Sequence, residues 1–77
     1  MDELMFSYDQ EADVLYMSIG RPAEGMDYVE VDDNTILRVH PETREVVGVT
    51  IIDFAKRVGK SMPLSLPIKA QFDLVHR

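Results

Sequence analysis

The sequence predicts a mainly β protein of the α+β class: an antiparallel meander of five to six strands with one short helix near the C-terminus. Most of the chain alternates apolar and polar residues with the period of a β-strand. The segments between these stretches are short and rich in glycine, proline, aspartate and asparagine. Short connections favour pairing between consecutive strands. A length of 77 residues suits one domain, so we expect residues 1–77 to form a single domain.

Five stretches carry the strand pattern, and each ends at a cluster of turn-forming residues. The expected strands are residues 4–8, 14–19, 26–31, 35–40 and 45–52. Gly48 lies inside the last and most apolar of these stretches. A glycine at such a position predicts a β-bulge or a close approach of another group to the backbone.

The C-terminal part of the chain contains the predicted helix and a sixth candidate strand. Asp53 has the residue type of an N-cap, residues 54–58 form the helix, and Gly59 ends it. Residues 62–67 hold two prolines and predict extended chain. Residues 68–74 then alternate apolar and polar side chains, so we expect a last strand there.

Alternation divides the side chains of the predicted sheet into a strongly apolar face and a mixed face. The apolar face holds Leu15, Met17, Ile19, Val29, Val31, Leu37, Val39, Val47, Val49 and Ile51. The mixed face holds Val14, Tyr16, Met26, Tyr28, Ile36, Val46 and Ile52, together with Ser18, Glu30, Arg38, His40 and Thr50. A lone antiparallel sheet normally keeps one face polar, and one short helix and a tail can cover only one face. We therefore expect the apolar face to pack under the helix and the C-terminal segment.

The mixed face is then expected to contact a second copy or another protein, because small domains without disulfides often gain stability by association. We predict a homodimer with an interface drawn from Tyr16, Tyr28, Ile36, Ile52, Ile68 and Phe72. The last two belong to the predicted final strand, which would alternatively add to the sheet of a neighbour. The competing interpretation is a curled, partly closed barrel that buries both faces within one chain.

The charge of the chain bears on its partners. There are 14 acidic and 8 basic residues, a formal net charge of −6, which argues against nucleic-acid binding and favours a basic protein partner. The basic cluster Lys56, Arg57 and Lys60 lies where it complements the dipole of the predicted helix. No apolar run approaches the roughly 20 residues needed to cross a bilayer, and no signal-peptide pattern is present, so we expect a cytoplasmic protein without a membrane partner.

Candidate chemistry is sparse. The absence of cysteine excludes a disulfide scaffold, an iron–sulfur cluster and a thiolate zinc site. Asp9, Glu11 and Asp13 suggest a calcium loop, but the glycine and glutamate that an EF-hand loop requires are missing, so a solvated turn is the better interpretation. The acidic residues 30, 32 and 33 lie beside a predicted turn. Paired carboxylates can act as acid and base, but a solvated loop is again the better interpretation.

His40 and His76 have no metal-ligand spacing, and no nucleophile, phosphate or dinucleotide motif accompanies them. We therefore expect no catalytic, cofactor-binding or metal-binding residues, and a non-enzymatic protein-interaction module that self-associates. The alternative is a small ligand-binding or catalytic domain with a site at a dimer cleft, lined by Asp9, Glu30 or His40.

The run from Tyr8 to Tyr16 reads Y-D-Q-E-A-D-V-L-Y and resembles the Y-D-x-E-A-D-x-L-Y signature of a family of short prokaryotic proteins, a domain of unknown function. Residues 29–37 and 47–57 resemble further segments of that family, with Thr50 and Ala55 in place of its usual glutamate and serine. The resemblance covers residues 6–57 and leaves 58–77 outside. The resemblance brings no established activity and no catalytic residues that could be assigned to this sequence. Some members resemble small partners encoded beside toxin-like proteins, which implies an antitoxin-type role.

The residues of this run also have a structural interpretation. Tyr8 and Tyr16 flank the first predicted hairpin, and we expect the two rings to pack together across the strands. The acidic residues between them then form a soluble loop that discourages edge pairing.

Overall fold

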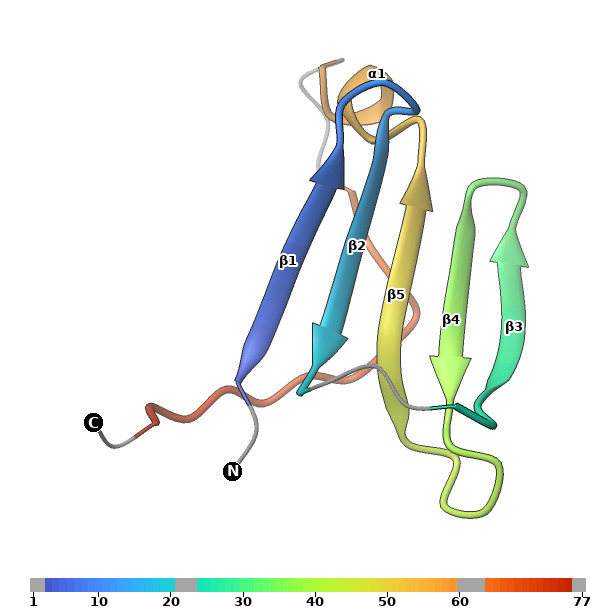
Figure 1. Cartoon of the computed structure of the whole chain (residues 1–77), viewed down its shortest axis with the longest axis vertical. Coiled ribbons are helices and arrows are strands. Elements are labelled where there is room, and N and C mark those ends of the chain that lie inside the picture. Colours follow the sequence, from blue (N-terminus) through green and yellow to red (C-terminus); the bar gives the residue numbers. More distant parts are fainter. Residues whose placement is uncertain (1–2, 21–23, 60–63, 76–77) are drawn as a thin grey trace.

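The protein folds into one antiparallel sheet with a short helix at its end (Figure 1). The computed structural model describes residues 3–20, 24–59 and 64–75. Its elements are β1 (Leu4–Asp9), β2 (Val14–Ile19), β3 (Asp27–Asp32), β4 (Thr35–Val39), β5 (Val46–Ile52) and α1 (Phe54–Val58). The predicted fold class, an antiparallel and mainly β domain with one short helix near the C-terminus, is confirmed. No helix in the described ranges is long and apolar enough to cross a membrane.

The strands lie in the order β1-β2-β5-β4-β3. Hairpins join β1 to β2, β3 to β4 and β4 to β5, as the short connections predict. The expectation that every consecutive pair of strands would be neighbours is wrong for β2 and β3, because β2 pairs with β5. β5 is the most apolar strand, and it lies in the centre of the sheet, where Val49 and Ile51 are buried. At the edge of the sheet, where a meander would place β5, these side chains would be more exposed.

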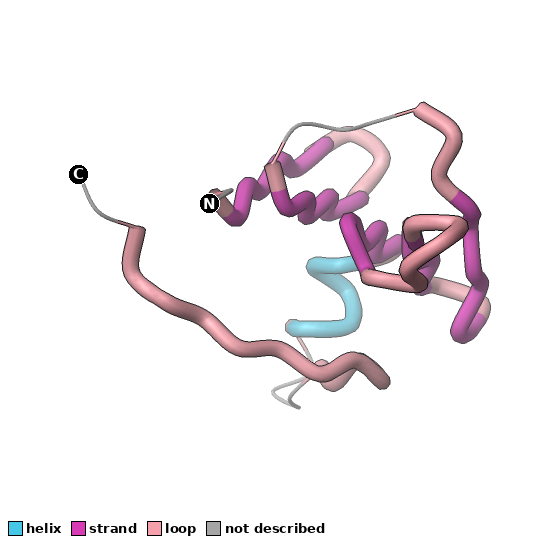
Figure 2. The backbone as a smooth tube through the Cα atoms, turned by 90° about the horizontal axis from the view of Figure 1, so that it is seen from below, coloured by secondary structure: helices cyan, strands magenta, loops and turns pink. Residues whose placement is uncertain are grey.

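The core lies on one face of the sheet, which we call the covered face. Its buried centre is the cluster Leu37, Val39, Val49 and Ile51. Half-buried apolar side chains from the helix and the C-terminal segment pack against this cluster: Phe54, Leu64, Leu66 and Ile68. Figure 2 shows α1 and the C-terminal segment on the same side of the sheet. The prediction that the strongly apolar face packs under these two elements is confirmed.

A β-bulge in β5 confirms the prediction made for Gly48. Arg38 pairs with Gly48 and the next residue, Val39, pairs with Val46, so Val47 has no partner in β4. The bulge shifts the alternation at the start of β5. Val46, which was expected on the mixed face, therefore packs against the core cluster. Val14 was also expected on the mixed face. It pairs with Ile52 and keeps the alternation of that face, but it is buried, at 9% exposure.

Residues 64–75, which we call the tail, form no strand, so the predicted last strand over 68–74 is wrong. The tail crosses beneath the covered face and does not run along a sheet edge (Figures 1 and 2). Its alternating apolar residues Leu64, Leu66 and Ile68 contact the core, which explains the period-two pattern without a hydrogen-bonded ladder. Beyond them, Phe72 and Leu74 are 76% and 94% exposed.

Candidate functional site

The second face of the sheet lies opposite α1 and the tail, and we call it the open face. Strand register assigns two central rows of side chains to it. One row is Met5, Ser18, Gly48, Arg38 and Tyr28, and the other is Ser7, Tyr16, Thr50, Ile36 and Glu30. Large aromatic surface is accessible here, because Tyr16 is 45% exposed and Tyr28 is 73% exposed.

Arg38 lies in the middle of the open face, against the glycine opposite it. A Cβ atom at Gly48 would stand 2.8 Å from both Nε and Nη2 of Arg38. The guanidinium group therefore lies against the backbone of β5 in space that only glycine leaves free. Arg38 is half-buried, and among the described residues its side chain makes no ion pair or hydrogen bond.

The open face is hollowed around this guanidinium group. A concavity of about 410 Å³ is lined by side chains that include Arg38, Tyr16, Tyr28, Met5 and Thr50. One cation thus stands among two aromatic rings, a methionine and small hydroxyl groups. Such a surface can bind an aromatic or apolar group together with a carboxylate.

The predicted interface residues divide between the two faces. Tyr16, Tyr28 and Ile36 lie on the open face, and Ile52, which pairs with Val14, continues that face at the end of β5. Ile68 packs against the core on the covered face, and Phe72 belongs to the exposed part of the tail. The structure therefore brings together four of the six residues.

Arg38 and Gly48 were each assigned to a strand from the sequence, but the contact between the Arg38 side chain and Gly48 was not predicted. Their pairing depends on the register between β4 and β5, which the bulge sets. A glycine inside the most apolar strand was the signal in the sequence.

Asp13 organises the end of the sheet where the chain enters α1. Its Oδ1 atom accepts a hydrogen bond from the Tyr8 hydroxyl at 2.7 Å and another from the Ala55 amide at 2.8 Å. Its carbonyl oxygen accepts a third from the Phe54 amide at 3.1 Å. The Tyr8 ring packs edge-on against Phe54, with 6.0 Å between the centroids. The acidic loop therefore fixes the N-terminus of the helix.

These contacts shift two pKa values. The Ala55 amide, followed by the Tyr8 hydroxyl, lowers the pKa of Asp13 below its ordinary value. The hydrogen bond to the Asp13 carboxylate raises the pKa of Tyr8. The folded state therefore favours the ionised form of Asp13 and the protonated form of Tyr8. These are the forms that make the observed hydrogen bonds.

Of two predictions about this region, one is confirmed in part and the other is wrong. Asp53 lies at the N-cap position of α1, as predicted, but it makes no side-chain capping bond. Its backbone is left-handed, with φ 57°, and its Oδ2 atom accepts a hydrogen bond from Asn34 Nδ2 at 3.3 Å. Tyr8 and Tyr16 do not pack together: Tyr8 is opposite Leu15, whereas Tyr16 is opposite Ser7, so the two rings lie on opposite faces.

Asp9, another acidic residue of the first loop, holds the turn. Asp9 Oδ1 accepts hydrogen bonds from the amides of Glu11 and Ala12, both at 3.1 Å. This is the geometry of a tight hairpin loop. Within the described ranges, no three histidine, aspartate or glutamate side chains gather as ligands for a metal ion.

The second acidic cluster is also divided by the fold. Asp32 Oδ1 accepts a hydrogen bond from the Asn34 amide at 2.8 Å, which lowers the pKa of Asp32. Arg57 lies 3.8 Å from Asp32 Oδ2 and donates to the buried Thr35 hydroxyl at 3.2 Å. Glu30 lies on the open face, apart from this network.

The basic cluster at the end of α1 serves the fold. Arg57 is engaged by Asp32 and Thr35, and Lys56 Nζ lies 3.8 Å from Asp53 Oδ1. Lys60, the third member of the predicted cluster, lies outside the described residues.

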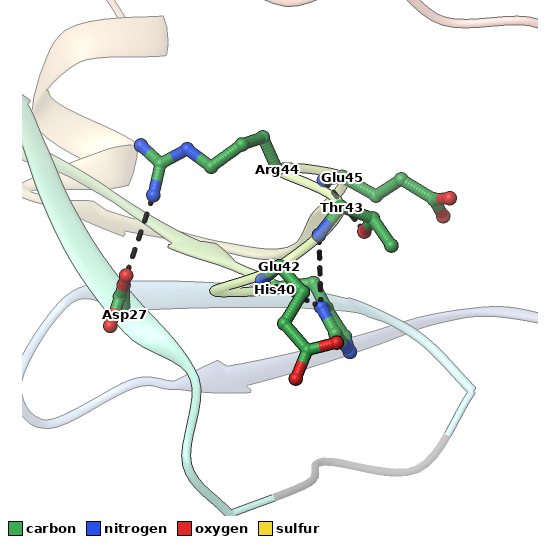
Figure 3. A network of polar contacts seen from close by, with 6 residues as sticks. All are labelled: Asp27, His40, Glu42, Thr43, Arg44 and Glu45. Carbon is green, nitrogen blue, oxygen red and sulfur yellow. Dashed lines mark hydrogen bonds and ion pairs between the residues drawn. The ribbon is translucent and has the colours of Figure 1, made fainter.

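His40 organises the turn between β4 and β5 (Figure 3). Its Nδ1 atom accepts hydrogen bonds from the amides of Glu42, at 3.1 Å, and Thr43, at 3.2 Å. Arg44 crosses from the same turn to Asp27 at 3.4 Å. An imidazole nitrogen that accepts two backbone amides is occupied by the turn itself. His76 lies outside the described residues.

Residues 5–54 match a protein family described as "Protein of unknown function (DUF2283)". The match spans most of the chain, and the protein belongs to this family. The resemblance to a family of unknown function is thereby confirmed. Comparison with curated proteins and with solved structures gave no match. The matched segment includes the Tyr8–Asp13 contact and the whole open face, whereas the tail lies outside it.

Proposed function

We propose that this protein is a non-enzymatic interaction module whose open face binds a second copy of the chain. The observation that carries the proposal is the unequal cover of the sheet. The helix and the tail pack on one face, while the other presents Tyr16 and Tyr28 at 45% and 73% exposure. Tyrosine and arginine are enriched in interfaces, and small domains without disulfides gain stability by association.

The charge distribution favours a second copy as the occupant. Each chain has a net charge of −6, so two copies repel each other over most of their surfaces. The central rows of the open face carry one cation and one anion, Arg38 and Glu30, which cancel. Two copies therefore meet with the least repulsion when these faces come together.

The acidic remainder of the surface suits a basic protein partner. The narrower form of the proposal is an antitoxin-type role, as the partner of a toxin-like protein in the cytoplasm. Its support is the net charge of −6 and the resemblance of some family members to such partners. The proposal includes no nucleic acid, no membrane and no cofactor.

The alternative, a ligand-binding or catalytic site at a dimer cleft, has less support. Asp9 and His40, two of its three candidate residues, use their side chains to hold backbone turns. These turns lie at opposite ends of the sheet (Figure 1), so the two side chains cannot meet in one site of a single chain.

Sedimentation equilibrium tests the proposal. The wild-type protein is expected to sediment with twice its monomer mass of 8.8 kDa at micromolar concentration. Tyr28→Ser should shift the equilibrium to monomer. Phe72→Ser is the matched control, because Phe72 is similarly exposed but belongs to the tail. A wild-type monomer, or dissociation by Phe72→Ser in place of Tyr28→Ser, would overturn the proposal.

A further inference from the structure

We infer that Arg38 of one copy forms an ion pair with Glu30 of the second copy across the open face. This inference rests on the proposed function and adds the contact that sets how the two copies align. It follows from the position of the guanidinium group, from the cost of covering it, and from the location of the acidic residues.

Arg38 already lies at the centre of the open face in the single chain. Gly48 leaves the guanidinium group room against the β5 backbone, and Tyr28 lies directly opposite Arg38 on the neighbouring strand. The group therefore lies in the centre of the face, half-buried against the sheet. A guanidinium group that lies against the sheet can present its planar set of donors to a carboxylate of a covering surface.

Covering the open face would remove water from this cation. Arg38 has no anionic partner among the described residues of its own chain. Burial of a charge without a partner carries a large desolvation penalty, so the covering surface has to supply an anion. A purely apolar occupant would leave the guanidinium group unsatisfied.

Glu30 is the acidic residue that a second copy can bring to this point. It is exposed, it lies in the second central row of the open face, and it makes no ion pair within the described part of its own chain. Two other acidic side chains are engaged elsewhere: Asp27 with Arg44, and Asp9 with the amides of its turn.

Two-fold symmetry doubles the contact. In an isologous dimer, if Arg38 of one copy meets Glu30 of the other, the reverse pair forms as well. All four charges of the two central regions are then neutralised. The pairs also penalise other alignments, which would place like charges together or leave Arg38 covered and unpaired.

Charge reversal with complementation tests this pairing. Arg38→Glu alone places two glutamates at each contact, and Glu30→Arg alone places two arginines there. Each variant should dissociate at least about tenfold more readily than the wild type in sedimentation equilibrium. An equimolar mixture of the two variants should recover dimer close to the wild-type level, because both contacts of the heterodimer are then between opposite charges.

Matched controls are available on the turn between β4 and β5. Arg44→Glu and Glu45→Arg make the same charge changes at exposed positions outside the two central rows of the open face, and they should leave association within about twofold of wild type. Circular dichroism confirms that each variant is folded. Arg38→Gln and Glu30→Gln provide neutral replacements if a reversal prevents folding, and each should also weaken the dimer.

The outcomes separate this inference from the proposed function. A wild-type monomer overturns both. A wild-type dimer that is no more sensitive to the two reversals than to the controls overturns only the Arg38–Glu30 pair. If the reversals dissociate the dimer and the mixture does not recover, while the double variant Arg38→Glu, Glu30→Arg does, the pair forms within one chain and the inference is wrong.

Discussion

Asp13 and Ala55 are separated by 42 positions in the sequence, and yet the Asp13 carboxylate accepts the Ala55 amide at 2.8 Å. Through this bond the loop between β1 and β2 fixes the first turn of α1. The Tyr8 hydroxyl binds the same carboxylate oxygen. The acidic loop that resembled a metal site is therefore a structural connection between the first hairpin and the last regular element.

Asp13→Ala is expected to lower the thermal unfolding temperature, because the Ala55 amide and the Tyr8 hydroxyl lose their shared acceptor. Asp13→Asn, which keeps an oxygen and tolerates the left-handed backbone at φ 56°, should lie between the wild type and the alanine variant. Circular dichroism melts provide the measurement. Asp33→Ala is the control, since Asp33 is an exposed acid of a turn. Equal stability of the two alanine variants would contradict the role given to Asp13.

Stability should fall in acid. The pKa values of Asp13 and Asp32 are lowered in the folded protein from an ordinary value of 3.8. The ionised carboxylates therefore stabilise the fold above that value, and their contribution is lost as the pH falls through the lower pKa of the folded state. Urea unfolding midpoints between pH 7 and pH 2 should show the decline. The decline should be smaller in Asp13→Asn; an unchanged profile would count against the assignment.

The raised pKa of Tyr8 predicts a loss of stability in alkali. The protonated hydroxyl donates to Asp13, so its contribution is complete below the ordinary pKa of 10.0 and disappears as the pH rises through the higher pKa of the folded state. Tyr8→Phe keeps the ring against Phe54 and removes the titrating group. The variant should lose this part of the alkaline dependence, which urea midpoints from pH 8 to pH 11 measure. The same dependence in both proteins would refute the prediction.

Gly48→Ala should separate stability from association. The new Cβ would stand 2.8 Å from the guanidinium group, which can move because it is the end of a flexible side chain. The free energy of unfolding should change by less than about 1 kcal/mol, since the φ angle of Gly48 is not left-handed. Displacement of Arg38 should weaken the dimer several-fold by sedimentation. On an Arg38→Gln background the substitution should have little further effect, and an equal effect there would contradict the coupling.

The two faces should respond differently to truncation. Ile51 is 2% exposed in the core cluster, and Ile51→Ala should cost about 2–5 kcal/mol, a large share of the stability of so small a domain. Ile36→Ala, on the open face, should cost less in the monomer and act mainly on association. Urea unfolding at low protein concentration, where monomer dominates, compares the two. A larger loss for Ile36→Ala would mean that the open face is part of a core.

Much of this fold could be predicted from local pattern. The strand positions, the helix, the bulge at Gly48 and the covering of the strongly apolar face all follow from alternation and turn residues. The position of β5 between β2 and β4 could not be predicted so directly, because it depends on how much apolar surface each order buries.

The predictions that failed or were missed all depend on tertiary contacts, which a local sequence pattern does not specify. The tail alternates like a strand, but packing against a face and pairing along an edge require the same period. Asp53 has the residue type of a cap, but a left-handed backbone directs its side chain to Asn34, and Asp13 takes its place from another part of the chain. The unit of Arg38 and Gly48 likewise depends on a register that only the assembled sheet defines.

Nuclear Overhauser contacts between isotope-labelled and unlabelled copies test the central claim most directly. In a mixed sample, the rings of Tyr16 and Tyr28 should show contacts to open-face side chains of the other copy, including Ile36 and Met5. Contacts between copies that involve only the tail, or no contacts at all at concentrations well above micromolar, would contradict the assignment of the open face as the surface that joins two copies.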